Sequence, residues 1–298
     1  MLQNIYSRAA SAVSSSINTA LSIIKILLQA KPGLTLPAST KKECYILGNG
    51  PSLAESLRSH SDLLSQSELY VVNGFAISEY YVRLRPANYV FLDQYFTGYD
   101  GQNTPIPTVK QTFEHMIADT SWPLTLFVPA STRANPFWKE LQSKNRNIRV
   151  AFFNYVVFKG SSSIAHWFFR HNLAMPQCQN ILAASIYLTI NRHYEKVFLL
   201  GADHSWHEQL IVDENNTVAT LDKHFYNTGG TQVNLKQRAI KADSYGVHAY
   251  FASLAKAFYS YVVLSRYAKS QKVAIYNASS KTYIDAFERV TLPKAERD

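Results

Sequence analysis

Short apolar runs alternate with polar segments along most of the chain. The runs are rich in β-branched and aromatic residues, as buried strands are, and several of the segments between them carry apolar residues at helical spacing. This alternation predicts an α/β fold with a doubly wound, mainly parallel, Rossmann-like sheet. Strands are expected at 44–47, 69–72, 89–92, 124–129, 150–157, 196–200 and 273–276, and helices at 54–64, 132–144, 180–194 and 247–269.

The first 42 residues have a different pattern and are expected to precede a main domain formed by residues 43–298. Apolar side chains recur at helical spacing at positions 17, 21, 24 and 28, and no acidic residue occurs from Met1 to Pro32. The apolar stretch 20–30 is interrupted by Lys25 and is shorter than the roughly 20 residues that span a bilayer. We predict an amphipathic helix that binds a membrane surface, or packs on its own domain or a partner, and then a linker at 31–42.

Polar, ligand-capable residues follow four of the predicted strands. They form the segments Gly48-Asn49-Gly50-Pro51-Ser52, Asn73-Gly74-Phe75, Asp93-Gln94 and Gly201-Ala202-Asp203-His204. Open α/β sheets bind ligands beyond the carboxyl ends of their strands, and glycines let a backbone approach a ligand closely. Pro51 and Ser52 suit the start of a helix, whose N–H groups attract phosphate. The pattern predicts a nucleotide site, with an ordinary strand-to-helix turn as the alternative. It matches neither a P-loop nor the dinucleotide fingerprint.

Composition narrows the class of protein. With 298 residues, of which 47% are apolar and 17% charged, the chain can bury a sizeable core as one large domain, with a small lid expected near 204–246. The net charge of +9 favours an anionic partner such as a nucleotide-sugar or a phospholipid surface. No block of five like charges occurs, which argues against a nucleic-acid partner. Cys44 and Cys178 lack a C-x-x-C partner, so a disulfide scaffold or structural zinc is not expected and a reducing compartment fits.

Four segments resemble a known group of proteins. They are GNGPSL from Gly48, NGF from Asn73, GADHSW from Gly201 and IYNAS from Ile275. The first three resemble the glycosyltransferase family 42 sialyltransferases, of the GT-A-like sialyltransferase type. They also resemble the wider group that contains the motility-associated-factor glycosyltransferases and the 6-hydroxymethylpterin pyrophosphokinase-like proteins.

This resemblance implies an inverting transfer from a CMP-activated sugar acid, a nonulosonic acid or Kdo-type sugar, without a metal cofactor. The acceptor would be a hydroxyl of a surface glycan or glycolipid, in lipopolysaccharide, capsule or glycoprotein synthesis. The enzyme would then work in the cytoplasm, at the inner face of the membrane. A homo-oligomer is left open.

The resemblance also implies roles for single residues. In family 42, asparagines of the GNG and NGF types contact the nucleotide, which corresponds to Asn49 and Asn73 here. Residues 180–185 stand where a Thr-Ser-Gly run is expected, which leaves Asn180 and Ser185 as candidate donors to the leaving phosphate. The other candidate donor-binding residues are Gly48, Gly50, Ser52, Asp93, Asp203, Tyr226 and, as second choice to Tyr226, Tyr245.

The general base is expected to be a histidine, because a side chain near its unperturbed pKa suits removal of a hydroxyl proton. Family 42 places its catalytic histidine shortly before a long helix that precedes the last strand, and His248 matches that location. His224 and His204 are the competing candidates. His204 and His207 also have an H-x-x-H spacing, but without a third ligand this is weak evidence for zinc.

Two other functions remain open from the sequence. A pterin-type pyrophosphokinase would share the GNGPSL and G-x-D segments but would need ATP, Mg²⁺ and an acidic metal site, for which Asp93, Asp203 and Asp222 are the plausible carboxylates. A non-catalytic nucleotide-sugar-binding subunit is the third possibility, because the segment at 180–185 departs from the family pattern. The sequence does not identify the sugar, the acceptor or the linkage.

Overall fold

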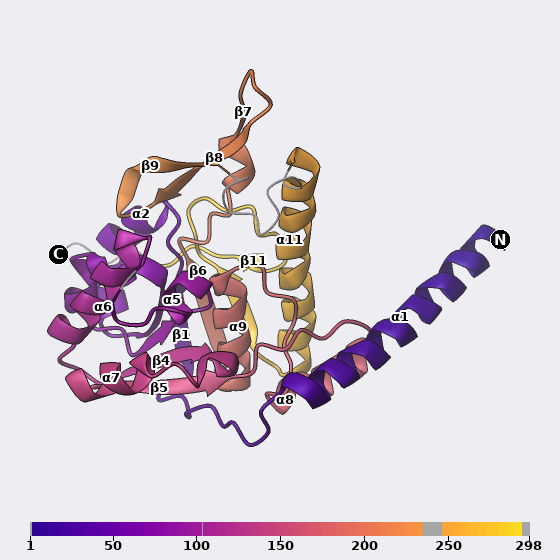
Figure 1. Cartoon of the computed structure of the whole chain (residues 1–298), viewed down its shortest axis with the longest axis horizontal. Coiled ribbons are helices and arrows are strands. Elements are labelled where there is room, and N and C mark those ends of the chain that lie inside the picture. The colour runs from indigo at the N-terminus through magenta and orange to yellow at the C-terminus, as the bar shows by residue number, and fades with distance from the viewer. Residues whose placement is uncertain (1, 103, 235–245, 294–298) are drawn as a thin grey trace.

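The computed structural model describes residues 2–102, 104–234 and 246–293 and has a central eight-stranded sheet with helices on both faces (Figure 1). Every neighbouring pair in this sheet is parallel. The α/β, mainly parallel fold expected from the sequence is therefore confirmed. The strands, in spatial order, are β11 (Glu288–Arg289), β10 (Ala274–Asn277), β6 (Lys196–Leu200), β1 (Glu43–Leu47), β2 (Glu68–Val72), β3 (Asn88–Val90), β4 (Leu124–Pro129) and β5 (Ile148–Phe153).

The strand order reverses at β1. The chain steps outward from β1 to β5, then returns across the sheet and places β6 on the other side of β1. Ile46 accordingly pairs in register with Tyr70 of β2 and with Leu199 of β6. Such a reversal leaves a crevice at the carboxyl ends of the two central strands, which is where open α/β sheets bind ligands.

Helices cover both faces of the sheet, which explains why its central strands are almost continuously apolar. The helices are α1 (Leu2–Gln29), α2 (Leu53–Ser59), α3 (Ser61–Ser65), α4 (Tyr80–Leu84), α5 (Gln94–Thr97), α6 (Pro107–Asp119), α7 (Phe137–Lys144), α8 (Ser162–Arg170), α9 (Ile181–Asn191) and α11 (Val247–Ser270), with 3-10 turns η1 (Asn73–Ile77), η2 (Ala130–Thr132) and η3 (Trp206–Gln209). One core forms around α9, where Ile46 and Tyr187 are fully buried. The other lies beneath α2 and α6, where Leu47 and Phe113 are buried.

Several expected elements have different limits in the structure, and three of them differ most. The strand expected at 150–157 ends at Phe153, and beyond it Val157 forms only an isolated bridge with Met175. The helix expected at 54–64 is two short helices that meet at His60. The helix expected from 132 begins at Phe137, directly after Pro136, because a proline is tolerated only at the start of a helix.

A second sheet lies above the carboxyl edge of the central sheet (Figure 1). Its antiparallel strands are β7 (Leu210–Val212), β8 (Val218–His224) and β9 (Asn227–Asn234). It occupies part of the segment 204–246 for which the sequence predicts a lid, and lid motion itself stays a prediction. Phe225 N–H donates to the Asn49 carbonyl at 3.1 Å, so the small sheet is joined to the loop after β1.

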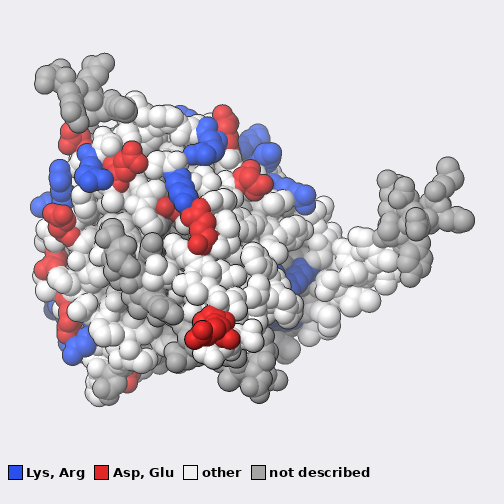
Figure 2. All heavy atoms as spheres, turned by 90° about the horizontal axis from the view of Figure 1, so that it is seen from above, with Lys and Arg blue, Asp and Glu red and all other residues white. Residues whose placement is uncertain are grey.

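The N-terminal helix α1 extends away from the body, with the chain's first residues farthest from it (Figure 1). Figure 2 shows acidic and basic side chains interspersed over one face of the body and little charge along the part of α1 that is not drawn in grey. Within the described part of the chain, only the segment Ala10–Gln29 is both long and apolar enough to cross a membrane. The apolar segment is therefore longer than the one expected from the sequence.

Candidate functional site

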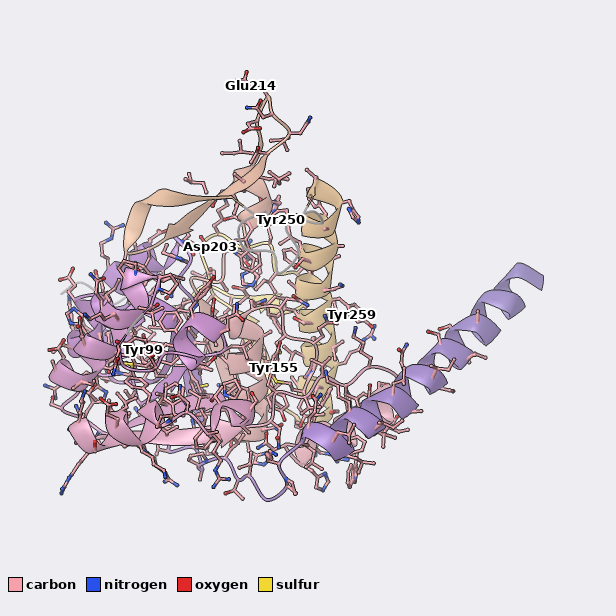
Figure 3. All side chains as sticks on the ribbon, in the orientation of Figure 1. Tyr99, Tyr155, Asp203, Glu214, Tyr250 and Tyr259 are labelled. Carbon is pink, nitrogen blue, oxygen red and sulfur yellow. The ribbon has the colours of Figure 1, made fainter. Side chains whose placement is uncertain are left out.

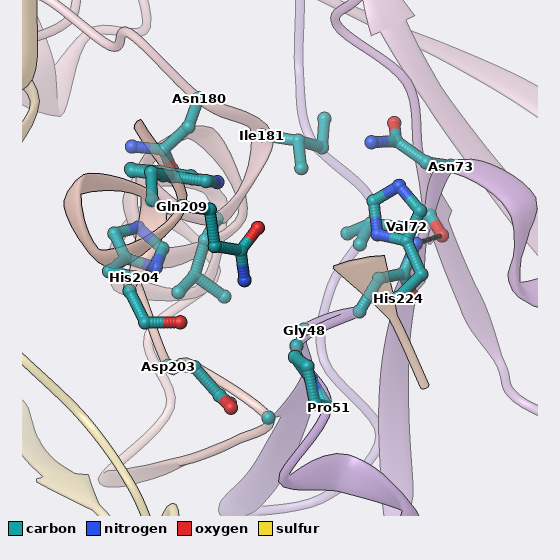
Figure 4. A pocket seen from close by; sticks show the side chains of 16 residues that line it. Gly48, Pro51, Val72, Asn73, Asn180, Ile181, Asp203, His204, Gln209 and His224 are labelled. Carbon is teal, nitrogen blue, oxygen red and sulfur yellow. Dashed lines mark hydrogen bonds between the residues drawn. The ribbon is translucent and has the colours of Figure 1, made fainter. Parts of the chain in front are cut away.

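A cleft lies at the carboxyl ends of β1, β2 and β6, where the strand order reverses (Figure 4). Its inner chamber has a volume of about 120 Å³ and is lined by the loops after these strands, the start of α9, η3 and the end of β8. An outer chamber of about 570 Å³ adds residues from α11 and from the segment before α9. The two chambers share lining residues, among them Asn73, Asn180 and His224, so they form one continuous cleft.

The floor of the cleft is a close contact between the loops after β1 and β6. Gly48 N–H donates to the Leu200 carbonyl at 2.7 Å, and Gly50 N–H donates to the Gly201 carbonyl at 3.0 Å. A Cβ on Gly48 would lie 2.6 Å from the Gly201 oxygen, and Gly201 itself has a φ of +62°. Both positions therefore require glycine, for the approach of two backbones as well as for the turn.

The start of α2, where the sequence analysis expects a phosphate, is occupied by the carboxylate of Asp203. This carboxylate accepts hydrogen bonds from the Ser52 N–H, at 3.0 Å, and from the Ser52 hydroxyl. The Ser52 N–H is thus not free for a ligand, contrary to expectation, and Ser52 does not line either chamber. Burial raises the pKa of Asp203, against the opposing effect of the two Ser52 hydrogen bonds. Asp203 joins the loops after β1 and β6 and also lines the inner chamber.

Three asparagines in the cleft wall each have a buried amide atom without a hydrogen-bond partner among the described residues. The atoms are Oδ1 of Asn49, Oδ1 of Asn73 and Nδ2 of Asn180. Asn49 Nδ2 donates to the Val72 carbonyl at 3.1 Å, which fixes the orientation of that amide and leaves Oδ1 as an acceptor. Asn73 has a φ of +47°, a conformation that asparagine tolerates better than most residues. Buried polar atoms are usually paired, so this grouping indicates a ligand site.

The amide of Asn180 is oriented by a chain of hydrogen bonds. Its Oδ1 accepts from the Ala183 N–H at 3.0 Å, which caps α9, and from the Tyr261 hydroxyl at 2.9 Å. Because Tyr261 has a single hydroxyl hydrogen, its oxygen accepts from the Nε2–H of His204. Nδ2 of Asn180 is consequently left as a donor at the first turn of α9, which contains no acidic residue.

The three candidate histidines have different positions. His224 lies at the end of β8, lines both chambers and stacks on Tyr226 with ring centroids 5.1 Å apart. His204 also lines the inner chamber, but burial lowers its pKa to about 3, so it is a weak base at neutral pH. His248 is exposed in the first turn of α11 and lines neither chamber. The structure thus does not bring His248, the first choice from the sequence, to the cleft.

The remaining predicted residues are divided between the cleft and the interior. Asp93 lines the outer chamber and caps α5 by accepting the Tyr95 N–H at 2.8 Å. Tyr226 lies beside Gly74, where an added Cβ would be 2.8 Å from its hydroxyl oxygen. Ser185 is fully buried, and its hydroxyl donates to the Ile181 carbonyl, so it does not reach the cleft. Tyr245 lies outside the described residues.

Several cleft residues have no signal in the sequence analysis. Gln209 follows the GADHSW segment, and its side chain projects toward the middle of the inner chamber (Figure 4). Tyr155 and Tyr250 line the outer chamber, Tyr155 from the loop after β5 and Tyr250 from the first turn of α11 (Figure 3). Only the position of Gln209, in the polar segment directly after a strand end, could have identified it. The tyrosines come from a loop and a helix whose relative placement requires the fold.

The described residues contain no group of three or more histidine, cysteine, aspartate or glutamate side chains that could hold a metal ion. Of the carboxylates considered for a kinase site, Asp203 is bonded to Ser52 and Asp93 caps α5, while Asp222 lies on β8. Asp203 lines the inner chamber and Asp93 the outer one, so these two side chains do not converge in the way that an all-carboxylate Mg²⁺ site requires.

No protein-family model and no curated protein matches this chain. A solved structure of similar arrangement is the MAf glycosyltransferase from Magnetospirillum magneticum AMB-1, with 11% sequence identity and a TM-score of 0.49. The match covers 91% of this chain and 38% of that one, so the chain corresponds to well under half of that protein's length.

Proposed function

We propose that this chain is a glycosyltransferase that binds a nucleotide-sugar donor in the cleft at the ends of β1, β2 and β6. The observation that carries the proposal is the grouping of unpaired amide atoms of Asn49, Asn73 and Asn180, which come from three elements and line one cleft. A donor with hydroxyl, amine and phosphate groups would satisfy both the acceptors and the donor. The resemblance of GNGPSL and NGF to the sialyltransferases supports the same assignment for Asn49 and Asn73.

The leaving phosphate of the proposed donor is assigned to the start of α9 rather than to the start of α2. Helix N-termini leave N–H groups without intrahelical partners and favour negative charge. At α9 these groups lie beside the Asn180 Nδ2 donor, and Ile181 and Leu182 line the inner chamber. At α2 the corresponding position already holds the Asp203 carboxylate. These observations support Asn180 as the main contact to the leaving phosphate.

The proposed reaction uses a CMP-activated sugar acid and needs no metal. The acceptor hydroxyl oxygen attacks the anomeric carbon, the bond from that carbon to the phosphate oxygen breaks, and CMP leaves with the electron pair. The hydroxyl proton passes to a histidine, and the single displacement inverts the anomeric configuration. His224 is preferred as this base because it lines both chambers, so it can lie between donor and acceptor.

Melting temperatures with different nucleotides test the donor assignment. CMP, with EDTA present, should raise the melting temperature by several degrees at saturation, because only the folded chain binds it. UDP, GDP and ADP should have smaller effects. Stabilisation by ATP with Mg²⁺ and none by CMP would favour the pyrophosphokinase function instead. CMP binding without any glycosyl transfer would favour a non-catalytic binding subunit.

Substitution of single histidines tests the base. His224→Ala should lower turnover by about 10² to 10⁴ with little change in CMP affinity, as loss of a general base does. His248→Ala is the matched control, because the exposed His248 lies outside the cleft and its loss should change turnover by less than about twofold. The opposite result would return the assignment to His248.

A further inference from the structure

One side of α1, which carries Thr19, Ser22 and the buried Ile26, is attached to the body of the protein. The Ser22 hydroxyl donates to the Lys159 carbonyl and accepts the Lys159 N–H, both at 2.9 Å, and Thr19 Oγ1 accepts the Ser161 N–H at 2.9 Å. Thr19 and Ser22 are 8% and 6% exposed. A Cβ on Gly160, whose φ is +124°, would lie 2.1 Å from Thr19 Oγ1, so the loop before α8 fits closely against the helix.

The end of α1 is fixed in the same way. Lys31 N–H donates to Asn154 Oδ1 at 2.8 Å, and Asn154 Nδ2 returns a hydrogen bond to the Lys31 carbonyl at 2.9 Å. Asn154 is almost completely buried. The second half of α1 therefore has a defined rotation about its axis relative to the body, and this rotation decides which face is left outside.

The outer face of α1 is apolar. Its exposed large apolar side chains are Val13, Ile17, Leu21, Ile24, Leu27 and Leu28, which are between 53% and 78% exposed. At about 100° per residue, positions 17, 21, 24 and 28 lie on the side opposite to 15, 19 and 22. The body-facing side also buries Ile26 in the core, so α1 has apolar side chains on both sides, whereas an ordinary surface helix has a single apolar stripe that faces the core. Large exposed apolar stripes of this kind mark interaction sites.

The charge around this face identifies the partner. No acidic residue occurs from Met1 to Pro32, whereas Lys25 lies within the helix and Lys31 follows it. The neighbouring helix α8, which begins at the contact with α1, leaves Ile164 and Trp167 40% and 47% exposed. An apolar face with flanking lysines and a nearby exposed tryptophan matches the interface of a bilayer that contains anionic lipids.

We propose that α1 lies in the plane of an anionic membrane, with Ile17, Leu21, Ile24 and Leu28 inserted at the headgroup boundary. A spanning orientation is disfavoured although Ala10–Gln29 is long enough, because the middle of that segment is bonded to Lys159 and Ser161. Spanning would take this polar loop into the hydrocarbon layer. The inference does not depend on the proposed glycosyltransferase activity.

Sedimentation of the full-length protein with vesicles tests the proposal. The vesicles are of phosphatidylcholine alone, or of phosphatidylcholine with about a third phosphatidylglycerol. We expect binding to the anionic vesicles, weaker binding to the neutral ones, and partial release at about 1 M salt, which screens the lysines but not the apolar contact. The combined variant Leu21→Gln, Ile24→Gln and Leu28→Gln should bind anionic vesicles at least about tenfold more weakly.

Glutamine keeps a high helix propensity, so the melting temperature of this variant should stay close to that of the wild type. The matched control carries Val82→Gln, Ile211→Gln and Val212→Gln, at positions that are 48%, 44% and 50% exposed on α4 and β7, and should bind like the wild type. If the triple variant does not fold, Leu28→Gln alone, at a position that is 77% exposed, gives the same test with a smaller expected loss.

Three results would overturn the proposal. Equal vesicle binding by wild type and the α1 variant would exclude the face as the membrane contact. A wild-type dimer that does not bind vesicles and that the α1 variant converts to a monomer would make the face an interface between copies. Resistance of vesicle-bound protein to extraction with alkaline carbonate would indicate a spanning helix, whereas extraction supports the in-plane arrangement.

Discussion

Hydrogen bonds inside the fold fix the orientation of the Asn180 amide, which lines the cleft. Ala183 N–H and the Tyr261 hydroxyl both bond to Oδ1, and His204 bonds to Tyr261 from behind. An asparagine amide that is free to flip would offer either an oxygen or a nitrogen to a ligand. Here the two bonds to Oδ1 leave only the nitrogen, which is the atom that an anionic ligand requires.

The buried position of His204 predicts how stability depends on pH. Its pKa is about 3 in the folded protein and near the ordinary 6.5 in the unfolded chain. As the pH falls below about 6.5, the unfolded chain takes up a proton that the folded protein does not. Stability should therefore fall by up to about 1.4 kcal/mol per pH unit until the pH approaches 3.

Urea unfolding at pH 7 and pH 4.5 measures this effect. His204→Gln keeps an N–H donor for Tyr261 but does not titrate, so it should lose roughly 2 kcal/mol less stability than the wild type over this interval. His171→Gln, at an exposed histidine, is the control and should behave like the wild type. Equal losses in His204→Gln and the wild type would show that His204 is not held neutral by burial.

Single residues could be predicted where the backbone alone decides their place. Asn49, Asn73 and Asp203 follow strand ends, and all three line the inner chamber as expected. Ser52 and Ser185 could not be placed, because their partners, the Asp203 carboxylate and the Ile181 carbonyl, depend on the final packing. Asn180 was identified from a family pattern, but its donor orientation depends on Tyr261, which lies 81 residues later in the chain.

At the scale of elements, hydrophobic periodicity predicts the helices and strands that are formed by burial of their apolar residues. The strands at 124–129 and 196–200 have the limits expected from their apolar runs. The α9 helix was expected because its residues are apolar on all sides, and the structure buries it almost completely. The hydrophobic pattern does not predict the small sheet of β7, β8 and β9. Its strands contain polar residues, and they pair with each other rather than with strands of the central sheet.

Helix α1 illustrates a limit of the same reasoning. Its spacing predicted an amphipathic helix, and the helix is present from Leu2 to Gln29. Periodicity alone could not show which side meets the body. That information comes from the hydrogen bonds of Thr19 and Ser22 and the burial of Ile26, which attach one side to the body and leave the larger apolar face outside.

At the scale of the whole molecule, the order of the strands in the central sheet brings the cleft residues together. The reversal between β1 and β6 brings the Gly48 and Gly201 loops into contact, and the return of the chain through α9 places Asn180 opposite Asn73 across the cleft (Figure 4). The sequence predicted that several strand ends carry ligand-capable residues. It could not predict that β6, which comes last among them in the chain, would lie directly beside β1.

Affinity for CMP in an Asn180→Asp variant tests the central claim, that the cleft binds a nucleotide-sugar donor with its phosphate at the start of α9. Aspartate is as good a helix cap as asparagine, so the bonds to Ala183 and Tyr261 should remain and the melting temperature should change little. The Nδ2 donor, however, becomes a carboxylate oxygen that repels phosphate.

Asn215→Asp adds the same charge at an exposed residue far from the cleft and serves as the control. Isothermal titration should give a Kd for Asn180→Asp that is at least about tenfold above that of the wild type, the loss of roughly 1.4 kcal/mol expected for a charge-assisted hydrogen bond. An unchanged Kd for CMP in a folded Asn180→Asp protein would contradict the account.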